Sequence, residues 1–301
     1  MLRLDAKGWL FVALGIFTAF YLWVLVTGLR ERAKTDDVRP NWKTAAAGFV
    51  TAFFDTLGIG SFATTTSIFR HWRLVDDGLL PGTLNVGITL PTVVQAYIYT
   101  RLIPVDSRTL ILMIAAAVVG AWLGAPIVAR WPKARIQLGM GTALLIAAAI
   151  FLAGALSVLP AGGTALALSG GKLAFAIVGN FALGALMTLG IGLYGPCMIL
   201  VSLLGLTPAA AFPIMMGSCA FLMPVASARF VKLQWYDPRA VLGLAIGSVP
   251  AVFLAAGIVW SLPLKAIQWL VIVVVVYTAI GLLRAAQRER AQTQGAAAVS
   301  H

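Results

Sequence analysis

The residues best suited to chemistry lie in a five-residue sequence that the chain contains twice. Residues 56–60 read Thr-Leu-Gly-Ile-Gly, and residues 188–192 repeat them without change. Threonine hydroxyls and glycine amides donate hydrogen bonds, and glycine lets a ligand approach the main chain closely. Where a helix restarts after such a break, its first amides are unpaired and carry the positive end of the helix dipole. This combination is suited to binding an anion.

We therefore predict a substrate site formed by both copies and by the residues just after them. The predicted substrate-binding residues are Thr56, Gly58, Gly60, Ser61, Thr64, Thr188, Gly190, Gly192 and Pro196. The alternative is that the glycines only permit close helix packing, as small residues do in membranes.

Asp55 is the acidic residue that lies well inside an apolar segment, directly before Thr56. Carboxylates inside a membrane are costly and usually functional. The corresponding residue of the second copy is Met187, so Asp55 is not part of the duplicated framework. We predict that Asp55 takes up a proton during coupled transport. The alternative is that it caps a half-helix or pairs with a basic side chain.

Further polar and thiol side chains in apolar segments are candidates for lining a pore. They are Asn85, Gln95, Cys197 and Ser218. Each polar group is equally suited to joining neighbouring helices, and a buried cysteine ordinarily behaves as a small apolar residue. The sequence contains no catalytic signature, nucleotide-binding loop or metal-ligand cluster. We therefore expect no enzyme activity, no catalytic residue, no metal and no cofactor.

Composition indicates that the elements around these residues lie in lipid. The 301 residues are 60% hydrophobic and 11% charged, whereas soluble domains are about 25% charged. The apolar residues form stretches of about 20, the length that crosses a bilayer core. The net charge of +12 comes from short basic runs between these stretches, which favours anionic lipid headgroups over nucleic acid as partners.

The repeated sequence marks a duplication of the chain. A second match, Ile-Gln at 136–137 and again at 267–268, has nearly the same spacing. The predicted regions are an N-terminal transmembrane helix with a basic cytoplasmic linker (1–42), a first repeat (43–159), a linker (160–171), a second repeat (172–284) and a polar C-terminal tail (285–301).

The first segment of each repeat is predicted to be broken. Residues 173–204 would form a helix about 48 Å long, which exceeds the bilayer core, and Gly190, Gly192, Gly195 and Pro196 interrupt it. Treating each broken segment as a re-entrant hairpin gives the better separation of Lys and Arg between the two membrane faces. The expected fold is an all-α polytopic membrane protein. It has two inverted repeats, each a re-entrant broken-helix hairpin plus three transmembrane helices, preceded by one extra N-terminal transmembrane helix.

Residues 184–196 and 203–211, together with the small-residue sequence at 120–125, resemble the TauE/SafE sulfite exporter family. The resemblance extends over about residues 44–283. It implies a permease for a sulfur-containing oxyanion such as sulfite or an organosulfonate.

The expected function is secondary transport of a small anion by alternating access at a midplane site. The alternatives are a passive anion channel and a membrane-embedded enzyme or assembly factor. Expected partners are the small anionic substrate, membrane lipids and protons as the coupling ion; nucleic acid is not expected, and a homo-oligomer is left open. The expected location is the bacterial plasma (inner) membrane, with the N-terminus outside and the C-terminus cytoplasmic.

Overall fold

The computed structural model describes residues 6–34, 37–76, 78–128, 133–156, 163–187 and 193–299. The regular structure of these residues is entirely helical, and no strand forms among them. This confirms the predicted all-α class. The helices divide into two compact units, one of residues 1–114 and 212–261 (unit 1) and one of residues 115–211 and 262–301 (unit 2).

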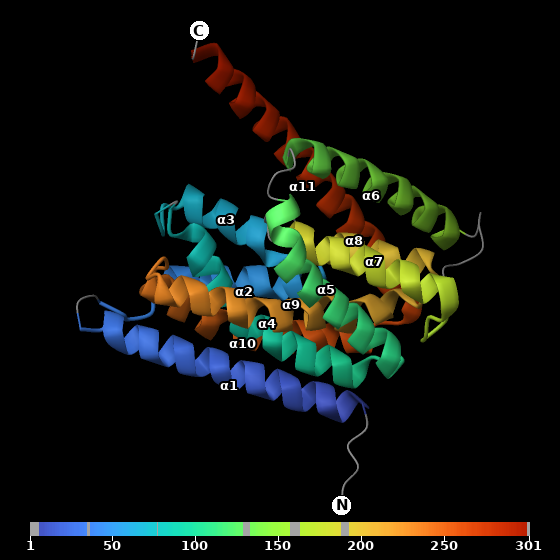
Figure 1. Cartoon of the computed structure of the whole chain (residues 1–301), viewed down its shortest axis with the longest axis horizontal. Coiled ribbons are helices and arrows are strands. Elements are labelled where there is room, and N and C mark those ends of the chain that lie inside the picture. Colours follow the sequence, from blue (N-terminus) through green and yellow to red (C-terminus); the bar gives the residue numbers. More distant parts are fainter. Residues whose placement is uncertain are drawn as a thin grey trace, which may run out of the picture. The chain divides into compact units, whose positions relative to one another are not determined.

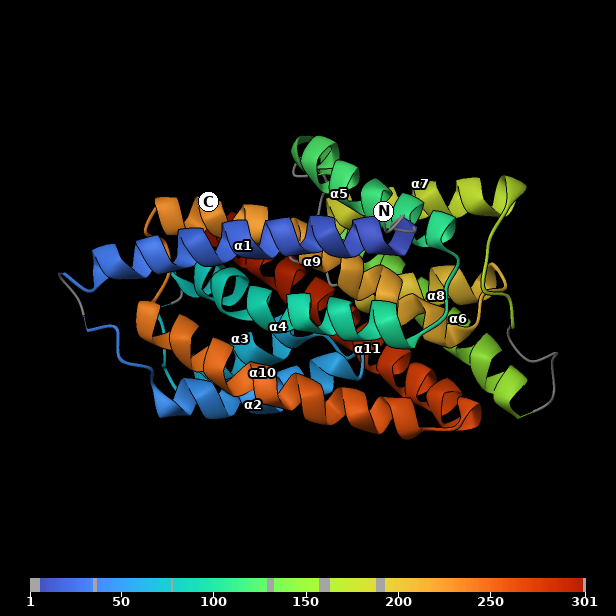
Figure 2. The same ribbon diagram turned by 90° about the horizontal axis from the view of Figure 1, so that it is seen from below.

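Unit 1 contains six helices and the first turns of a seventh among its described residues. They are α1 (Ala6–Arg32), α2 (Trp42–Thr56), α3 (Ser61–His71), α4 (Leu80–Leu102), α9 (Ala211–Lys232), α10 (Pro238–Ser261) and the start of α5 (Ser107–Val128). Helix α10 packs against both α2 and α4, and α1 contacts α4 (Figure 2). The buried Tyr21 fixes α1 to α4, because its hydroxyl donates to the Val86 carbonyl at 2.6 Å.

Unit 2 contains the rest of α5 and the second broken segment. Its other elements are α6 (Lys133–Ala155), α7 (Gly170–Met187), α8 (Tyr194–Leu203), the 3-10 turn η1 (Pro208–Ala210) and α11 (Leu264–Val299). Helix α11 packs along α6, and α8 contacts α6, α7 and α11 (Figure 1). Each unit therefore combines segments of both predicted repeats.

Five described helices are long and apolar enough to cross a membrane, judged by length and composition. They are Ala6–Arg32, Gly170–Met187, Pro208–Lys232, Pro238–Val259 and Trp269–Ala291. Three shorter apolar helices accompany them, at Ser107–Leu123, Ala134–Ile146 and Tyr194–Leu203. The first segment predicted to be broken is divided into α2 and α3. In the second, α7 and α8 lie on either side of residues 188–192, which are outside the described residues.

Glycine brings helix backbones together at one pair of helices in each unit. In unit 1, a Cβ atom on Gly247 of α10 would overlap the Ala45 carbonyl of α2. In unit 2, a Cβ atom on Gly184 of α7 would overlap the Ala117 carbonyl of α5. Close backbone approach through small residues is a usual basis of helix association in lipid, where burial of apolar surface gives no driving force.

We expect Gly247→Leu to destabilise the protein by about 1–3 kcal/mol, because the added side chain must displace the α2 backbone. The measurement is thermal unfolding of the purified protein in detergent. Gly257→Leu is the matched control on the same helix, since a Cβ atom at Gly257 meets nothing within 4 Å. Equal unfolding temperatures for the two variants would contradict the packing role of Gly247.

Candidate functional site

The first Thr-Leu-Gly-Ile-Gly sequence forms the tip of a helical hairpin in unit 1. Helix α2 ends at Thr56, and α3 begins at Ser61. Gly58 and Gly60 have φ angles of 99° and 81°, which L side chains rarely adopt. The hydroxyls of Thr51 on α2 and Thr65 on α3 hydrogen-bond at 3.0 Å. The chain thus reverses direction at the tip, and α3 runs back along α2.

Asp55 caps the N-terminus of α3. Its Oδ1 atom accepts a hydrogen bond from the backbone N–H of Ser61 at 2.6 Å, and its Oδ2 atom accepts one from Nε2 of Gln95 at 2.9 Å. The carboxylate therefore lies at the positive end of the α3 dipole, where a negative charge is stabilised. The sequence suggests that Asp55 takes up a proton, caps a half-helix or pairs with a basic side chain. The observed geometry is that of a half-helix cap. Proton uptake by Asp55 stays a prediction.

Thr56 belongs to the same buried cluster, but its hydroxyl already has protein partners. It donates to the Ala52 carbonyl at 2.7 Å and accepts Nε2 of Gln95 at 2.9 Å. The Thr56 carbonyl accepts the hydroxyl of Tyr99 at 2.9 Å. Gln95 and Tyr99 are one helical turn apart on α4, so that helix holds the tip from one side. Tyr99 was not predicted, although its spacing from Gln95 is a signal that could have indicated it.

Gly60 borders open space at the tip. A Cβ atom built on it would meet nothing within 4 Å. Its φ of 81° and ψ of 125° show that conformation, not crowding, requires glycine here. The two predicted hydroxyl residues that follow do not face this open space freely. Ser61 is buried, and the Thr64 hydroxyl donates to the Ser61 carbonyl of its own helix at 2.9 Å.

Among the other predicted pore-lining residues, Gln95 joins this cluster. Asn85 is half-buried and donates to the Pro81 carbonyl of its own helix at 3.0 Å. The buried hydroxyl of Ser218 donates to the Ile214 carbonyl of α9 at 2.7 Å. Cys197 is buried in α8 of unit 2. Polar side chains in a membrane helix often bond to their own backbone in this way.

The second copy of the sequence, residues 188–192, lies entirely outside the described residues, which end at Met187 and resume at Leu193. Predictions for Thr188, Gly190 and Gly192 therefore fall outside the structure's description. Pro196 is described, buried in the first turn of α8.

The two ends of the second broken segment lie beside each other. The Ala165 amide donates to the Gly205 carbonyl at 3.1 Å, and the Thr207 amide donates to the Ala165 carbonyl at 2.9 Å. Residues just before α7 are thus paired with residues just after α8. The segment that contains α7 and α8 therefore begins and ends at neighbouring positions.

Fold and site together define a multi-pass helical membrane protein whose helices break at a glycine-rich tip. Residues 1–152 match the family profile described as "Sulfite exporter TauE/SafE", and the chain belongs to this family. The match includes α1 and the first hairpin, so it reaches further toward the N-terminus than the resemblance read from residues 44–283. No curated protein and no solved structure matches the chain.

Proposed function

We propose that the protein is a secondary transporter for a small anion, and that the anion is a sulfur-containing oxyanion such as sulfite or an organosulfonate. The observation that carries the proposal is the α3 N-terminus, which already holds a carboxylate, that of Asp55, within 2.6 Å of a backbone amide. A site that stabilises one negative charge by an amide and a helix dipole is chemically suited to binding another anion in its place. Membership of the TauE/SafE family supports the substrate class.

The proposed architecture is two inverted repeats with re-entrant hairpins in the bacterial inner membrane, N-terminus outside and C-terminus cytoplasmic. Helices α2, α3 and α8 have 15, 11 and 10 residues, whereas about 20 are needed to span the bilayer core. The adjacent ends of the α7–α8 hairpin also support re-entry. The proposed repeat makes α2 equivalent to α7 and α10 to α5, and glycine gives close contacts in both the α2–α10 and the α5–α7 pair.

In the proposed mechanism, Asp55 and the substrate anion compete for the α3 N-terminus. Two negative charges a few ångströms apart repel each other strongly in a low-dielectric site. Protonation of Asp55 removes its charge and weakens its bond to the Ser61 amide. The anion then binds where the carboxylate was, so proton and anion binding are linked. Alternating access of this site to the two membrane faces completes the transport cycle.

The test is flux in liposomes that contain the purified protein. Uptake of sulfite, an organosulfonate, thiosulfate and a carboxylate would be measured with and without a proton gradient. We expect saturable uptake that prefers the sulfur oxyanions and increases with the gradient. Non-saturating flux that follows only the membrane potential would favour the channel alternative, and chemical change of the substrate would favour the enzyme alternative.

The re-entrant topology predicts which engineered cysteines react from each membrane face. In a background with Cys197 and Cys219 replaced by alanine, Trp72→Cys and Leu233→Cys should react with a membrane-impermeant reagent from the cytoplasm. Leu166→Cys should react from outside. All three side chains are exposed, at 55%, 48% and 44%. Reaction of Leu166→Cys from the cytoplasm would contradict the hairpin topology.

A further inference from the structure

Unit 2 contains an apolar groove that includes none of the residues at the α3 N-terminus. Pro196, predicted from the sequence to bind substrate, is one of its lining residues. The groove has a volume of about 270 Å³ and lies along the α7–α8 hairpin, with α6 as its third wall. Phe175, Gly179 and Leu183 line it from α7, at the spacing of one helix face. Leu200 and Leu203 line it from α8. The lining is almost wholly apolar, so an oxyanion would find no donors there.

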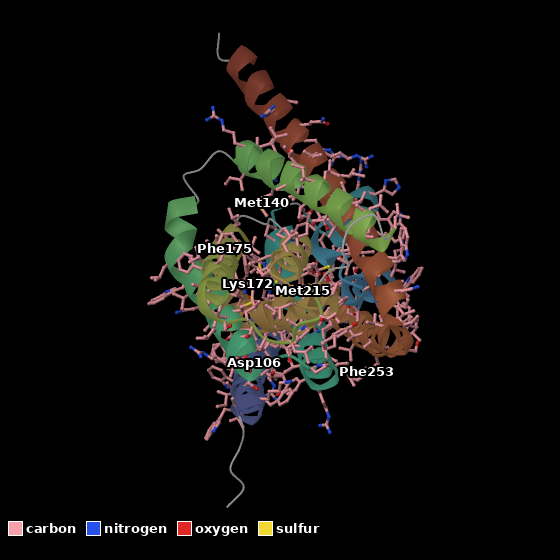
Figure 3. The ribbon with its side chains drawn as sticks, turned by 90° about the vertical axis from the view of Figure 1, so that its right-hand side faces the viewer. Asp106, Met140, Lys172, Phe175, Met215 and Phe253 are labelled. Carbon is pink, nitrogen blue, oxygen red and sulfur yellow. The ribbon has the colours of Figure 1, made fainter. Side chains whose placement is uncertain are left out.

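A positive charge lies at one end of this groove. Lys172 precedes Phe175 by one turn on α7, and its Nζ atom lies 3.6 Å from the position of a Cβ atom on Gly205, two residues after Leu203. Lys172 is exposed and belongs to the first turn of α7, where the helix dipole adds positive potential. Figure 3 shows Lys172 and Phe175 together on this helix. Glu289, near the far end of α11, is the single acidic residue in the sequence of unit 2.

The groove and Lys172 together extend over about one leaflet of a bilayer. From Phe175 to Leu183, the first and last groove-lining residues of α7, the helix rises by roughly 12 Å, and Lys172 extends this to roughly 16 Å. Half of the hydrocarbon core is about 15 Å. The Lys172 end of the groove is at the base of the hairpin, where its two ends lie side by side. The Leu183 end is nearer the tip. A lipid with its headgroup at the base would extend one acyl chain along the groove toward the tip.

We propose that this groove binds an anionic phospholipid, with its phosphate at Lys172 and one acyl chain between α6, α7 and α8. Charge complementarity with Lys172 selects this occupant over a zwitterionic lipid, whose headgroup has no net charge. The arrangement differs from an annular lipid because α6, α7 and α8 line the groove on three sides, with Phe175 and Leu203 among the lining residues. Leu200 packs directly against Gly179 and forms part of the groove wall. The proposal is independent of which anion the protein transports.

Native mass spectrometry of the full-length protein, with added phosphatidylglycerol or phosphatidylcholine of identical chains, tests the headgroup. We expect preferential retention of phosphatidylglycerol. Lys172→Gln should weaken its binding about fivefold, the equivalent of about 1 kcal/mol for one basic side chain at an anionic headgroup. Lys265→Gln is the matched control, an exposed lysine in the first turn of α11 in the same unit, and should leave binding unchanged.

A groove-filling variant tests the acyl chain. Leu200→Trp should reduce retention of both lipids severalfold, whereas Ile146→Trp, at a 60% exposed position of α6 that does not line the groove, should not. Equal unfolding temperatures of these variants would exclude misfolding as the cause. Lipid retention that is insensitive to Lys172→Gln or to Leu200→Trp would overturn the proposal. So would a dimer that Leu200→Trp dissociates, because the groove would then hold a second copy of the chain.

Discussion

Asp55→Asn is expected to abolish the dependence of anion uptake on a proton gradient while leaving anion exchange between the two membrane faces intact. With one coupled proton, each pH unit of gradient is worth about 1.4 kcal/mol, or about tenfold accumulation of the anion. The variant cannot ionise at this position, so its accumulation should not exceed the level reached without a gradient. The measurement is steady-state sulfite accumulation in liposomes at imposed gradients of zero, one and two pH units.

The structure makes this substitution unusually discriminating. Asparagine also caps helix N-termini, so its amide oxygen can still accept a hydrogen bond from the Ser61 amide. Like protonated Asp55, it is a neutral acceptor that the anion can displace. The variant therefore separates the charge of residue 55 from its capping role. Asp55→Ala removes both and should also lower the stability of the hairpin by about 1 kcal/mol. If Asp55→Asn accumulates the anion as wild type does, Asp55 is only a cap and the coupling proton binds elsewhere.

The hairpin was predictable from the sequence because its cause is local. Glycine at 58 and 60 permits backbone angles closed to other residues, and the expected restart of the helix at Ser61 is found. The length limit set by the bilayer likewise predicts a break within residues 173–204, at residues that lie outside those the structure describes. Backbone angles at glycine and the length of an apolar segment are properties of the local chain, and they do not depend on which helices pack against it.

The occupant of the α3 N-terminus was not predictable in the same way. Asp55 reaches Ser61 only because the turn at 57–60 brings a helix end back beside the end of α2. The role of Gln95 depends on the rotation of α4, which decides whether a polar side chain faces a neighbour or its own backbone. Asn85 has the same carboxamide group, yet it donates to the backbone of its own helix. Residue types along the chain therefore identified candidates, and tertiary packing selected among them.

Gly60→Ala is expected to impair both the stability of the hairpin and transport, although there is room for the added methyl group. The φ of 81° and ψ of 125° at Gly60 lie in a region that costs an L residue about 1–3 kcal/mol. Relief of that strain would rotate the Ser61 amide away from Asp55 and misdirect the first amides of α3. We expect a lower unfolding temperature and, because about 1.4 kcal/mol is tenfold in affinity, sulfite binding that is weaker by about fivefold or more.

Gly139→Ala is the matched control, since Gly139 of α6 also borders open space but has no positive φ. There the substitution should be neutral or stabilise the helix by up to about 1 kcal/mol, as alanine is the better helix former. The decisive comparison is sulfite affinity measured on both variants under conditions where both are folded. Should Gly60→Ala bind and transport sulfite like Gly139→Ala, the tip conformation would not matter for the anion, and the binding site would have to be sought away from the α3 N-terminus.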